Sequence, residues 1–198
     1  LFLSPQKTAA NQITVFSLSG AVLLSENSDA GWRLALPGAD GKAVEGWDQK
    51  LSHSRVHYDW QRRPVAAFEC AFGEPEQCTA RFSYADASAN DAHNRRGLLI
   101  RHDDTAGTQH FIEFSLTGTP LQTSRTFVAV PQWPIDWPEA ETERDVHLED
   151  EPAVTRLHCN ATGEPISQTD ALGNRQTFIQ TRAAELREVR LLLAGDES

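Results

Sequence analysis

The stretch Gln168-Thr169-Asp170-Ala171-Leu172-Gly173-Asn174-Arg175 contains the pattern that decides the fold, an acidic residue followed three positions later by glycine. The same spacing joins Asp104 to Gly107 and Asn160 to Gly163. A type I turn favours a short acceptor side chain at its first position and glycine at its fourth. Each occurrence therefore predicts a tight turn.

This spacing returns every ten or eleven residues over most of the chain, which has 198 residues. The glycine slots are Gly20, Gly31, Gly41, Leu51, Arg62, Gly97, Gly107, Gly118, Gly163, Gly173 and Ala184. The positions three residues earlier are Ser17, Ser28, Gly38, Asp48, Asp59, Asn94, Asp104, Ser115, Asn160, Asp170 and Thr181. Eight of the 12 glycines occupy these slots, so we assign both columns to structural turn positions. The six or seven residues left between turns match one ordinary strand.

The pattern predicts an all-β protein, an antiparallel meander of about eleven or more strands built from β-hairpin repeats. We expect a curved strip, because twisted open sheets rarely exceed about 10 strands without curling. Repeats over residues 1–125 would carry a loop at 70–93, and repeats resume over 153–198 with a strand at 186–193. Between them, 126–152 is an insertion rich in Pro, Trp and acidic residues, with a short helix beginning near Pro138.

Composition excludes several classes of protein. The net charge of −10 argues against a nucleic-acid-binding face and against an anionic-membrane anchor, since both need clustered Lys and Arg. No run approaches the roughly 18–20 apolar residues of a membrane span. The three cysteines form no even disulfide framework and no metal-ligand spacing. We therefore expect no cofactor and no metal.

The turn-bearing segments resemble a known repeat. Tyr58-Asp59, Arg101 to Gly107 and Gln168 to Arg175 are similar to the Rhs or YD repeat. More specifically, Asn94 to Gly118 and Asn160 to Gly195 resemble the C component of bacterial insecticidal toxin complexes, the Tc toxins. The chain departs from the repeat consensus where Leu51, Arg62 and Ala184 replace glycine.

This resemblance implies a structural role without catalysis. In that family the repeats wind a β-strip into a hollow shell, which a B component completes and which encloses a C-terminal toxic domain. The chain would then be a wall segment and a fragment of a longer polypeptide. Its partners would be the B component and the remaining repeats of the parent. The complex would be secreted or extracellular after synthesis in the bacterial cytoplasm.

The alternative is a carbohydrate- or protein-binding β-repeat module of a cell-surface or interbacterial Rhs protein. Trp133 and Trp137 are the candidate ligand or partner contacts, and they could equally plug the face of the sheet. The acidic stretch 139–151 fits either a solvated loop or a surface that docks on a basic partner.

Two short motifs suggest chemistry but fit a structural role better. His53 and His57 have a metal-like spacing, yet on a strand four residues span about 13 Å at roughly 3.3 Å per residue. Arg101-His102-Asp103-Asp104 places an imidazole beside carboxylates, but in the repeat frame Asp104 opens a turn.

Apolar strand-like segments such as Val15 and Leu191 to Leu193 have no evident partner in the sequence. Unpaired strand edges recruit further strands, so we expect the isolated chain to self-associate. At Arg62 the turn must either avoid the left-handed conformation or bear strain.

Overall fold

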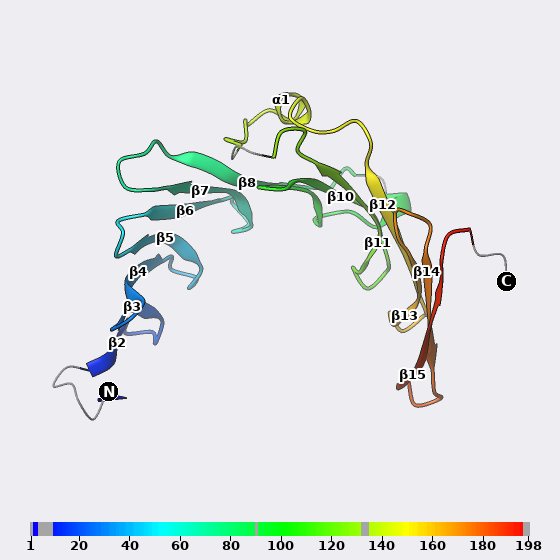
Figure 1. Cartoon of the computed structure of the whole chain (residues 1–198), viewed down its shortest axis with the longest axis horizontal. Coiled ribbons are helices and arrows are strands. Elements are labelled where there is room, and N and C mark those ends of the chain that lie inside the picture. Colours follow the sequence, from blue (N-terminus) through cyan, green and yellow to red (C-terminus); the bar gives the residue numbers. More distant parts are fainter. Residues whose placement is uncertain (1, 4–9, 90, 132–134, 196–198) are drawn as a thin grey trace. The chain divides into compact units, whose positions relative to one another are not determined.

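The computed structural model describes residues 2–3, 10–89, 91–131 and 135–195. Within these residues, fifteen strands form one sheet, and their order in the sheet is their order in the sequence (Figure 1). The strand pairs that the structure defines are antiparallel, for example β6 with β7 and β12 with β13. The prediction of an all-β antiparallel meander is confirmed.

The strands are β1 Phe2–Leu3, β2 Ala10–Phe16, β3 Val22–Asn27, β4 Gly31–Pro37, β5 Ala43–Asp48, β6 His53–Tyr58, β7 Pro64–Cys70, β8 Gln77–Tyr84, β9 Leu99–Asp104, β10 Gly107–Phe114, β11 Pro120–Phe127, β12 Ala153–Cys159, β13 Pro165–Thr169, β14 Arg175–Gln180 and β15 Leu186–Leu192. One 3₁₀ turn, η1, spans Asp91–His93, and one short helix, α1, spans Glu141–Asp145.

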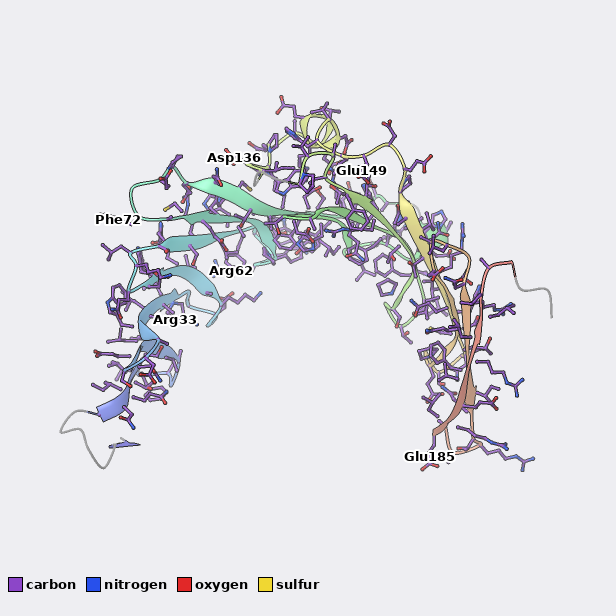
Figure 2. The ribbon with its side chains drawn as sticks, in the orientation of Figure 1. Arg33, Arg62, Phe72, Asp136, Glu149 and Glu185 are labelled. Atoms are coloured by element: carbon purple, nitrogen blue, oxygen red, sulfur yellow. The ribbon has the colours of Figure 1, made fainter. Side chains whose placement is uncertain are left out.

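The chain divides into two compact units. The first comprises Leu1–Arg81 with Ile135–Trp137, and the second comprises Phe82–Pro134 with Pro138–Ser198. Side chains project from both faces of the ribbon (Figure 2). Few apolar side chains of the described residues are buried: Ala66, Cys78 and Trp137 in the first unit, and Ala85, Phe114 and Val128 in the second. The sheet therefore depends mainly on strand pairing and on its turns.

Most hairpin turns share one pair of backbone hydrogen bonds. In the turn between β13 and β14, the amide of Gly173 donates to the carbonyl of Asp170 at 3.1 Å, and the amide of Asp170 donates to that of Asn174 at 3.0 Å. This is a type I turn followed by a left-handed residue that forms a β-bulge. The same pair of bonds begins at Ser17, Gly38, Asp48, Asp59, Ser115, Asn160 and Thr181.

The short acceptor side chain also binds the turn. Oδ1 of Asn160 accepts hydrogen bonds from the amides of Thr162 at 3.0 Å and Glu164 at 2.9 Å. Asp48 accepts from the amides of Lys50 and Ser52 in the same way. These amides would otherwise have only water as a partner, which explains the preference for Asp, Asn, Ser or Thr.

All eleven glycine slots have a positive φ. Glycine adopts this conformation at little cost, as at Gly20 with φ 87° and Gly118 with φ 81°. Leu51, Arg62 and Ala184 adopt it as well, with φ of 61°, 62° and 63°. The turn at Arg62 thus keeps the left-handed geometry and bears the strain that the sequence offered as one of two outcomes.

Three slots depart from this common turn. Before Gly31, Oδ1 of Asn27 accepts from the amides of Asp29 and Ala30, so the turn opens at Asn27 and not at Ser28. Gly107 pairs directly with Asp104 across a two-residue turn. The amide of Gly97 donates to the carbonyl of Ala85 in a longer loop.

The expected loop at 70–93 is wrong in part, because β8 occupies its centre. Gln77 pairs with Glu69, and Arg81 pairs with Ala66, so this segment forms a hairpin with β7. The segment carries Phe82 and Tyr84, which favour strands, but no glycine of the ten-residue frame marks its start. The repeat spacing alone therefore missed it.

The insertion is shorter than expected. Strand β11 continues to Phe127, and Val128 and Leu148 form an isolated bridge. The helix begins at Glu141, three residues after Pro138. Among the described residues, no helix is long and apolar enough to cross a membrane.

Candidate functional site

In the first unit, Asp136 and Trp137 of the Pro- and Trp-rich segment form hydrogen bonds with β8. The amide of Cys78 donates to Oδ1 of Asp136 at 2.8 Å, and the amide of Trp137 donates to the carbonyl of Cys78 at 3.0 Å. Nε of Arg81 donates to the carbonyl of Trp137 at 2.8 Å. These three bonds fix residues 136 and 137 against β8.

Trp137 is 1% exposed, so its ring is not available at the surface to stack on a sugar or to contact a partner. Its position is that of a plug on the sheet, the other interpretation that the sequence allowed. A large ring that is removed from water stabilises its site through the apolar area it buries. Trp133 lies outside the described residues.

In the second unit, charged side chains of α1 meet charged side chains of β9. Arg144 Nη1 donates to Asp103 Oδ2, and Arg101 Nη1 pairs with Asp145 Oδ1 at 2.8 Å. Arg101 Nε also donates to Asp103 Oδ1 at 2.8 Å, and Thr108 Oγ1 donates to the same oxygen at 2.5 Å. We call these five residues the ionic cluster.

The ionic cluster is buried except at Asp145, whose side chain is 56% exposed. Asp103 is 0% exposed, and Arg101 and Arg144 are each 4% exposed. Buried charges cost several kcal/mol unless each is paired and hydrogen-bonded. Burial lowers the pKa of Arg101, but its bonds to Asp103 and Asp145 outweigh burial and raise that pKa above its ordinary value. Arg101 therefore stays protonated within the cluster.

Both oxygens of Asp103 are occupied by donors, two on Oδ1 and one on Oδ2. A carboxylate engaged in this way is poorly placed to accept a proton from a substrate. His102 and Asp104 lie on the other face of β9, because successive side chains of a strand alternate. His102 stacks on Phe82 with ring centroids 4.5 Å apart, and Asp104 pairs with Arg125. The four residues 101–104 thus do not converge on one point.

In the first unit, Arg62 lies beside the turn that precedes β5 (labelled in Figure 2). Its Nε and Nη2 donate to Asp40 Oδ2 and Oδ1, each at 3.0 Å, and its guanidinium lies 5.3 Å from the ring centre of Tyr58. Lys42 Nζ donates to the carbonyl of Arg62 at 2.6 Å. The Arg62 guanidinium lowers the pKa of Asp40 to about 2. These contacts join the turn that contains Arg62 to the turn that contains Asp40.

The two histidines of the metal-like spacing have separate contacts. His53 stacks on Trp47 with centroids 5.0 Å apart, and its Nε2 lies 3.3 Å from Glu45 Oε2. His57 contacts Phe68 with centroids 4.8 Å apart. Over the described part of the chain, no group of three or more His, Cys, Asp or Glu side chains could hold a metal ion.

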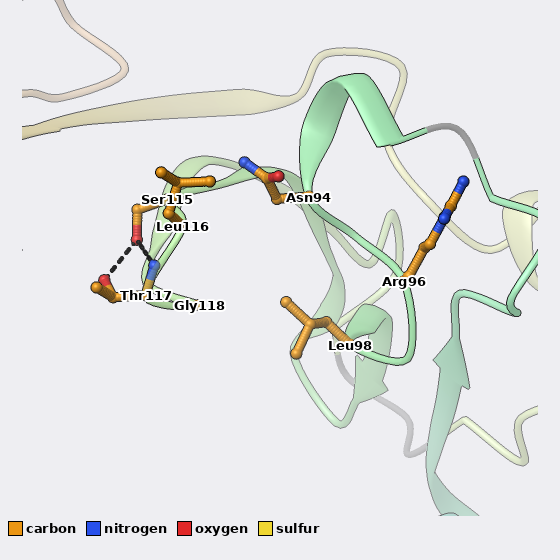
Figure 3. Close-up of a pocket in the computed structure, with 7 residues that line it drawn as sticks. All are labelled: Asn94, Arg96, Leu98, Ser115, Leu116, Thr117 and Gly118. Atoms are coloured by element: carbon orange, nitrogen blue, oxygen red, sulfur yellow. Dashed lines mark hydrogen bonds between the residues drawn. The ribbon is translucent and has the colours of Figure 1, made fainter.

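One open hollow of about 460 Å³ lies in the second unit between the loop 94–98 and the turn 115–118 (Figure 3). Its polar groups already bind the protein itself: Asn94 Nδ2 donates to the carbonyl of Phe114, and Arg96 Nε donates to that of Ala89. Leu116 is 94% exposed at its rim. Ligand sites bring several polar groups to one point, and this hollow does not.

The acidic residues of the stretch 139–151 fall into two groups, those that bind the sheet and those that face solvent. Asp145 joins the ionic cluster, and Glu141 Oε1 accepts from Ser83 Oγ at 2.8 Å. The remaining acidic side chains are exposed, namely Glu139, Glu143, Glu149, Asp150 and Glu151. The sequence predicted that this stretch is charged. It did not predict that the Arg144 side chain would be buried and bind Asp103 on the face of the sheet.

The chain is similar in sequence to known toxin subunits. No protein-family model matches the chain. Toxin subunit YenC1 of Yersinia entomophaga is 30% identical over 189 residues, which is 91% of this chain and 19% of YenC1. Toxin subunit YenC2 of the same organism is 26% identical over 94% of this chain and 22% of YenC2. The chain thus spans about a fifth of each relative's length.

Solved structures agree with these relatives. The crystal structure of TcdB2–TccC3 matches with a TM-score of 0.87 at 28% identity, over 96% of this chain and 9% of that chain. The Photorhabdus luminescens Tc holotoxin pore carrying TccC3-D651A matches with a TM-score of 0.86 at 28% identity, over 94% and 9%. The chain is therefore homologous to the YenC1 and YenC2 toxin subunits, and it shares the fold of the matching part of the TcdB2–TccC3 structure.

Proposed function

We propose that this chain is a structural wall segment of a bacterial toxin C component, and that its repeats help to form a hollow shell around a C-terminal toxic domain. The observation that carries this proposal is the match to the TcdB2–TccC3 structure over 96% of the chain at a TM-score of 0.87. Homology to two toxin subunits supports the assignment to a toxin complex.

The construction of the chain suits a wall. Each hairpin repeat contacts its neighbours, and such arrays gain stability by stacking units on one another. The described side chains that are most buried are small or belong to the two contacts with the insertion, so the sheet is a thin layer. A thin layer of hairpins can be extended by further repeats without a change in its local geometry.

The proposed partners are the B component and the remaining repeats of the parent chain. The matched structures are complexes of TcdB2 with TccC3, which supports a partnership of this kind. We propose a role without catalysis, because the polar groups of the ionic cluster are already engaged with one another. The complex would act outside the bacterium that makes it.

Within the chain we propose three parts: repeats that continue through Phe127, an insertion over 128–152 that docks on the sheet, and repeats over 153–198. The turn residues keep the strands in register. The isolated segment would also self-associate, since Leu186, Leu191 and Leu192 of β15 are 61%, 58% and 43% exposed. Light scattering should show association, and replacing Leu191 and Leu192 by Ser should reduce it.

Protease protection in the full parent polypeptide, bound to its B component, tests enclosure. The C-terminal domain should resist added protease in the intact complex. Gly107→Val should make that domain sensitive, because a side chain at Gly107 would collide with β11, where Phe127 Cα is 2.8 Å from the Cβ position. Gly20→Ala is the matched control, since nothing lies within 4 Å of its Cβ position. If protease digested the C-terminal domain in the intact complex as fast as it digests that domain outside the complex, enclosure would be refuted.

A further inference from the structure

Two pairs of adjacent arginines occur in the sequence, Arg62-Arg63 and Arg95-Arg96. Such pairs suit endoproteases whose specificity pocket carries an acidic side chain, because that pocket binds a guanidinium. Cleavage also requires that the arginine and the bond after it can leave their own contacts and enter the protease. The two pairs differ in how firmly the rest of the chain holds them.

The first pair is fixed in a tight turn. Arg62 donates to Asp40 through Nε and Nη2, each at 3.0 Å. Arg63 Nε donates to Asp59 Oδ2 at 2.7 Å. Pro64 follows directly, and its ring restricts the backbone of the residue before it. A protease therefore finds both guanidinium groups engaged and a stiff bond after the pair.

The second pair lies in the connection between β8 and β9, the longest connection between strands apart from the insertion. Arg96 and Gly97 are exposed, and Arg95 is half-buried. Among the described residues, neither arginine of this pair has an ion-pair partner. Arg96 Nε donates to the carbonyl of Ala89 at 3.0 Å, a bond that water can replace at an exposed site. The Arg96 side chain can thus leave its place at little cost.

The backbone around this pair can also open locally. The hollow of about 460 Å³ lies beside residues 94–98, so that side of the connection is not packed (Figure 3). The amide of Ala85 donates to the carbonyl of Leu98 at 3.0 Å, and the amide of Gly97 donates to the carbonyl of Ala85 at 2.9 Å. Breaking these bonds opens the connection without separating a strand pair of the sheet. Exposed loops of this kind are preferred sites of proteolytic cutting.

We propose that the bond between Arg96 and Gly97 is a cleavage site for a trypsin-like endoprotease, and that the cut leaves the two parts of the chain associated. Hydrolysis breaks this C–N bond: the hydroxyl of one water joins the Arg96 carbonyl carbon, and the remaining hydrogen joins the Gly97 nitrogen. The Arg96 guanidinium fills the acidic pocket of the protease. The site acts in this way whether or not the chain forms a shell.

Contacts on either side of the cut hold the two parts together. Asp136 and Trp137 belong to the downstream part, and Cys78 belongs to the upstream part. The amide of Cys78 donates to Asp136 Oδ1 at 2.8 Å, and the amide of Trp137 donates to the carbonyl of Cys78 at 3.0 Å. Trp137 is 1% exposed, so it also buries apolar area at this contact. The product is therefore a nicked chain that stays folded.

Limited digestion of the folded chain with trypsin tests the proposal. The first cut should give two fragments, residues 1–96 and 97–198, which intact mass identifies. These fragments should elute together from gel filtration in native buffer and should separate in denaturant. A first cut at any other bond would overturn the cleavage site. Separation of the fragments in native buffer would overturn the associated, nicked state.

Matched variants assign the cut to one arginine. Arg96→Gln should slow cleavage of this bond by roughly a hundredfold or more, because the acidic pocket is then left unpaired. Arg96→Lys should restore cleavage, and Arg95→Gln should retain it. The control is Arg182→Gln, since Arg182 is also exposed but lies in a tight turn closed by the hydrogen bond from the Thr181 amide to the Glu185 carbonyl at 2.8 Å.

The control should leave the first cut unchanged. Undiminished cleavage of the same bond in Arg96→Gln, loss of that cleavage in Arg95→Gln, or a first cut after Arg182 in the unaltered chain would each overturn the assignment to Arg96.

Discussion

Arg62 and Asp40 form a two-point ion pair between neighbouring turns, with Nε to Oδ2 and Nη2 to Oδ1 each at 3.0 Å. Arg62 occupies a slot that glycine fills elsewhere, and its φ is 62°. A guanidinium binds a carboxylate through two parallel bonds, which glycine cannot do. The left-handed strain at this turn is therefore offset by a contact between repeats.

The first prediction concerns the titration of Asp40. The Arg62 guanidinium holds the pKa of Asp40 at about 2, below the ordinary value of 3.8. Its contribution to stability is thus present above about pH 4 and is lost as the pH falls towards 2. NMR titration of the Asp40 carboxyl should give a midpoint near 2 in the unaltered chain. In Arg62→Gln the midpoint should rise towards 3.8, and an unchanged midpoint would show that the pair does not form in solution.

The second prediction concerns Ala184, whose φ is 63°. A left-handed residue other than glycine costs roughly 1–2 kcal/mol, whereas glycine loses more chain entropy on folding. Ala184→Gly should therefore raise the free energy of unfolding by about 0.5–1 kcal/mol, measured by urea denaturation. Ala183→Gly is the control at the preceding position, where φ is not positive, and it should lower stability. Destabilisation by Ala184→Gly would contradict the left-handed turn.

The third prediction separates two glycines. At Gly107 the φ is 135°, and a Cβ atom would lie 2.8 Å from Cα of Phe127 and also contact the carbonyl of Thr126. Gly107→Ala should cost about 3 kcal/mol or more, because backbone strain and a backbone collision combine. Gly20→Ala should cost only about 1 kcal/mol, since its Cβ position is open. Thermal denaturation of the two variants should show this difference in Tm, and equal shifts would refute it.

The fourth prediction concerns the acceptor column. Asn160→Ala removes the oxygen that binds the amides of Thr162 and Glu164, and should cost about 1–2 kcal/mol of folding stability. Asn160→Ser retains a short uncharged acceptor, of the kind that Ser115 supplies in its own turn, and it should lose less stability than Asn160→Ala. Chemical denaturation measures both. If the two variants lost the same stability, the side-chain oxygen would not be the stabilising group.

The fifth prediction concerns the ionic cluster. Asp103→Ala leaves two buried guanidinium groups without their shared carboxylate, and it should cost about 3–5 kcal/mol. Glu143→Ala changes an exposed acidic residue of the same helix and should have little effect. Unfolding followed by circular dichroism distinguishes them. A neutral Asp103→Ala would mean that the cluster is solvated and that residues 138–148 are held by other contacts.

Local physics made much of the fold predictable from the sequence. The ten-residue spacing of Asp170 with Gly173, and of its equivalents, predicted both the turns and the strand length, since a turn needs only residues close in sequence. The repeat frame also assigned Leu186 to Leu193 to a strand, and β15 spans Leu186–Leu192.

What the tertiary structure alone decided lies where distant segments meet. Strand β8 has no glycine of the repeat frame, so its pairing with β7 depends on long-range hydrogen bonds. The partners of Trp137 and Arg144 are 59 and 41 residues away in the sequence, at Cys78 and Asp103. Periodicity reports which residues share a turn or a strand face, but not which distant segment covers that face. The sequence by itself therefore determined the hairpin repeat, and tertiary contact decided where the insertion docks and which charges it buries.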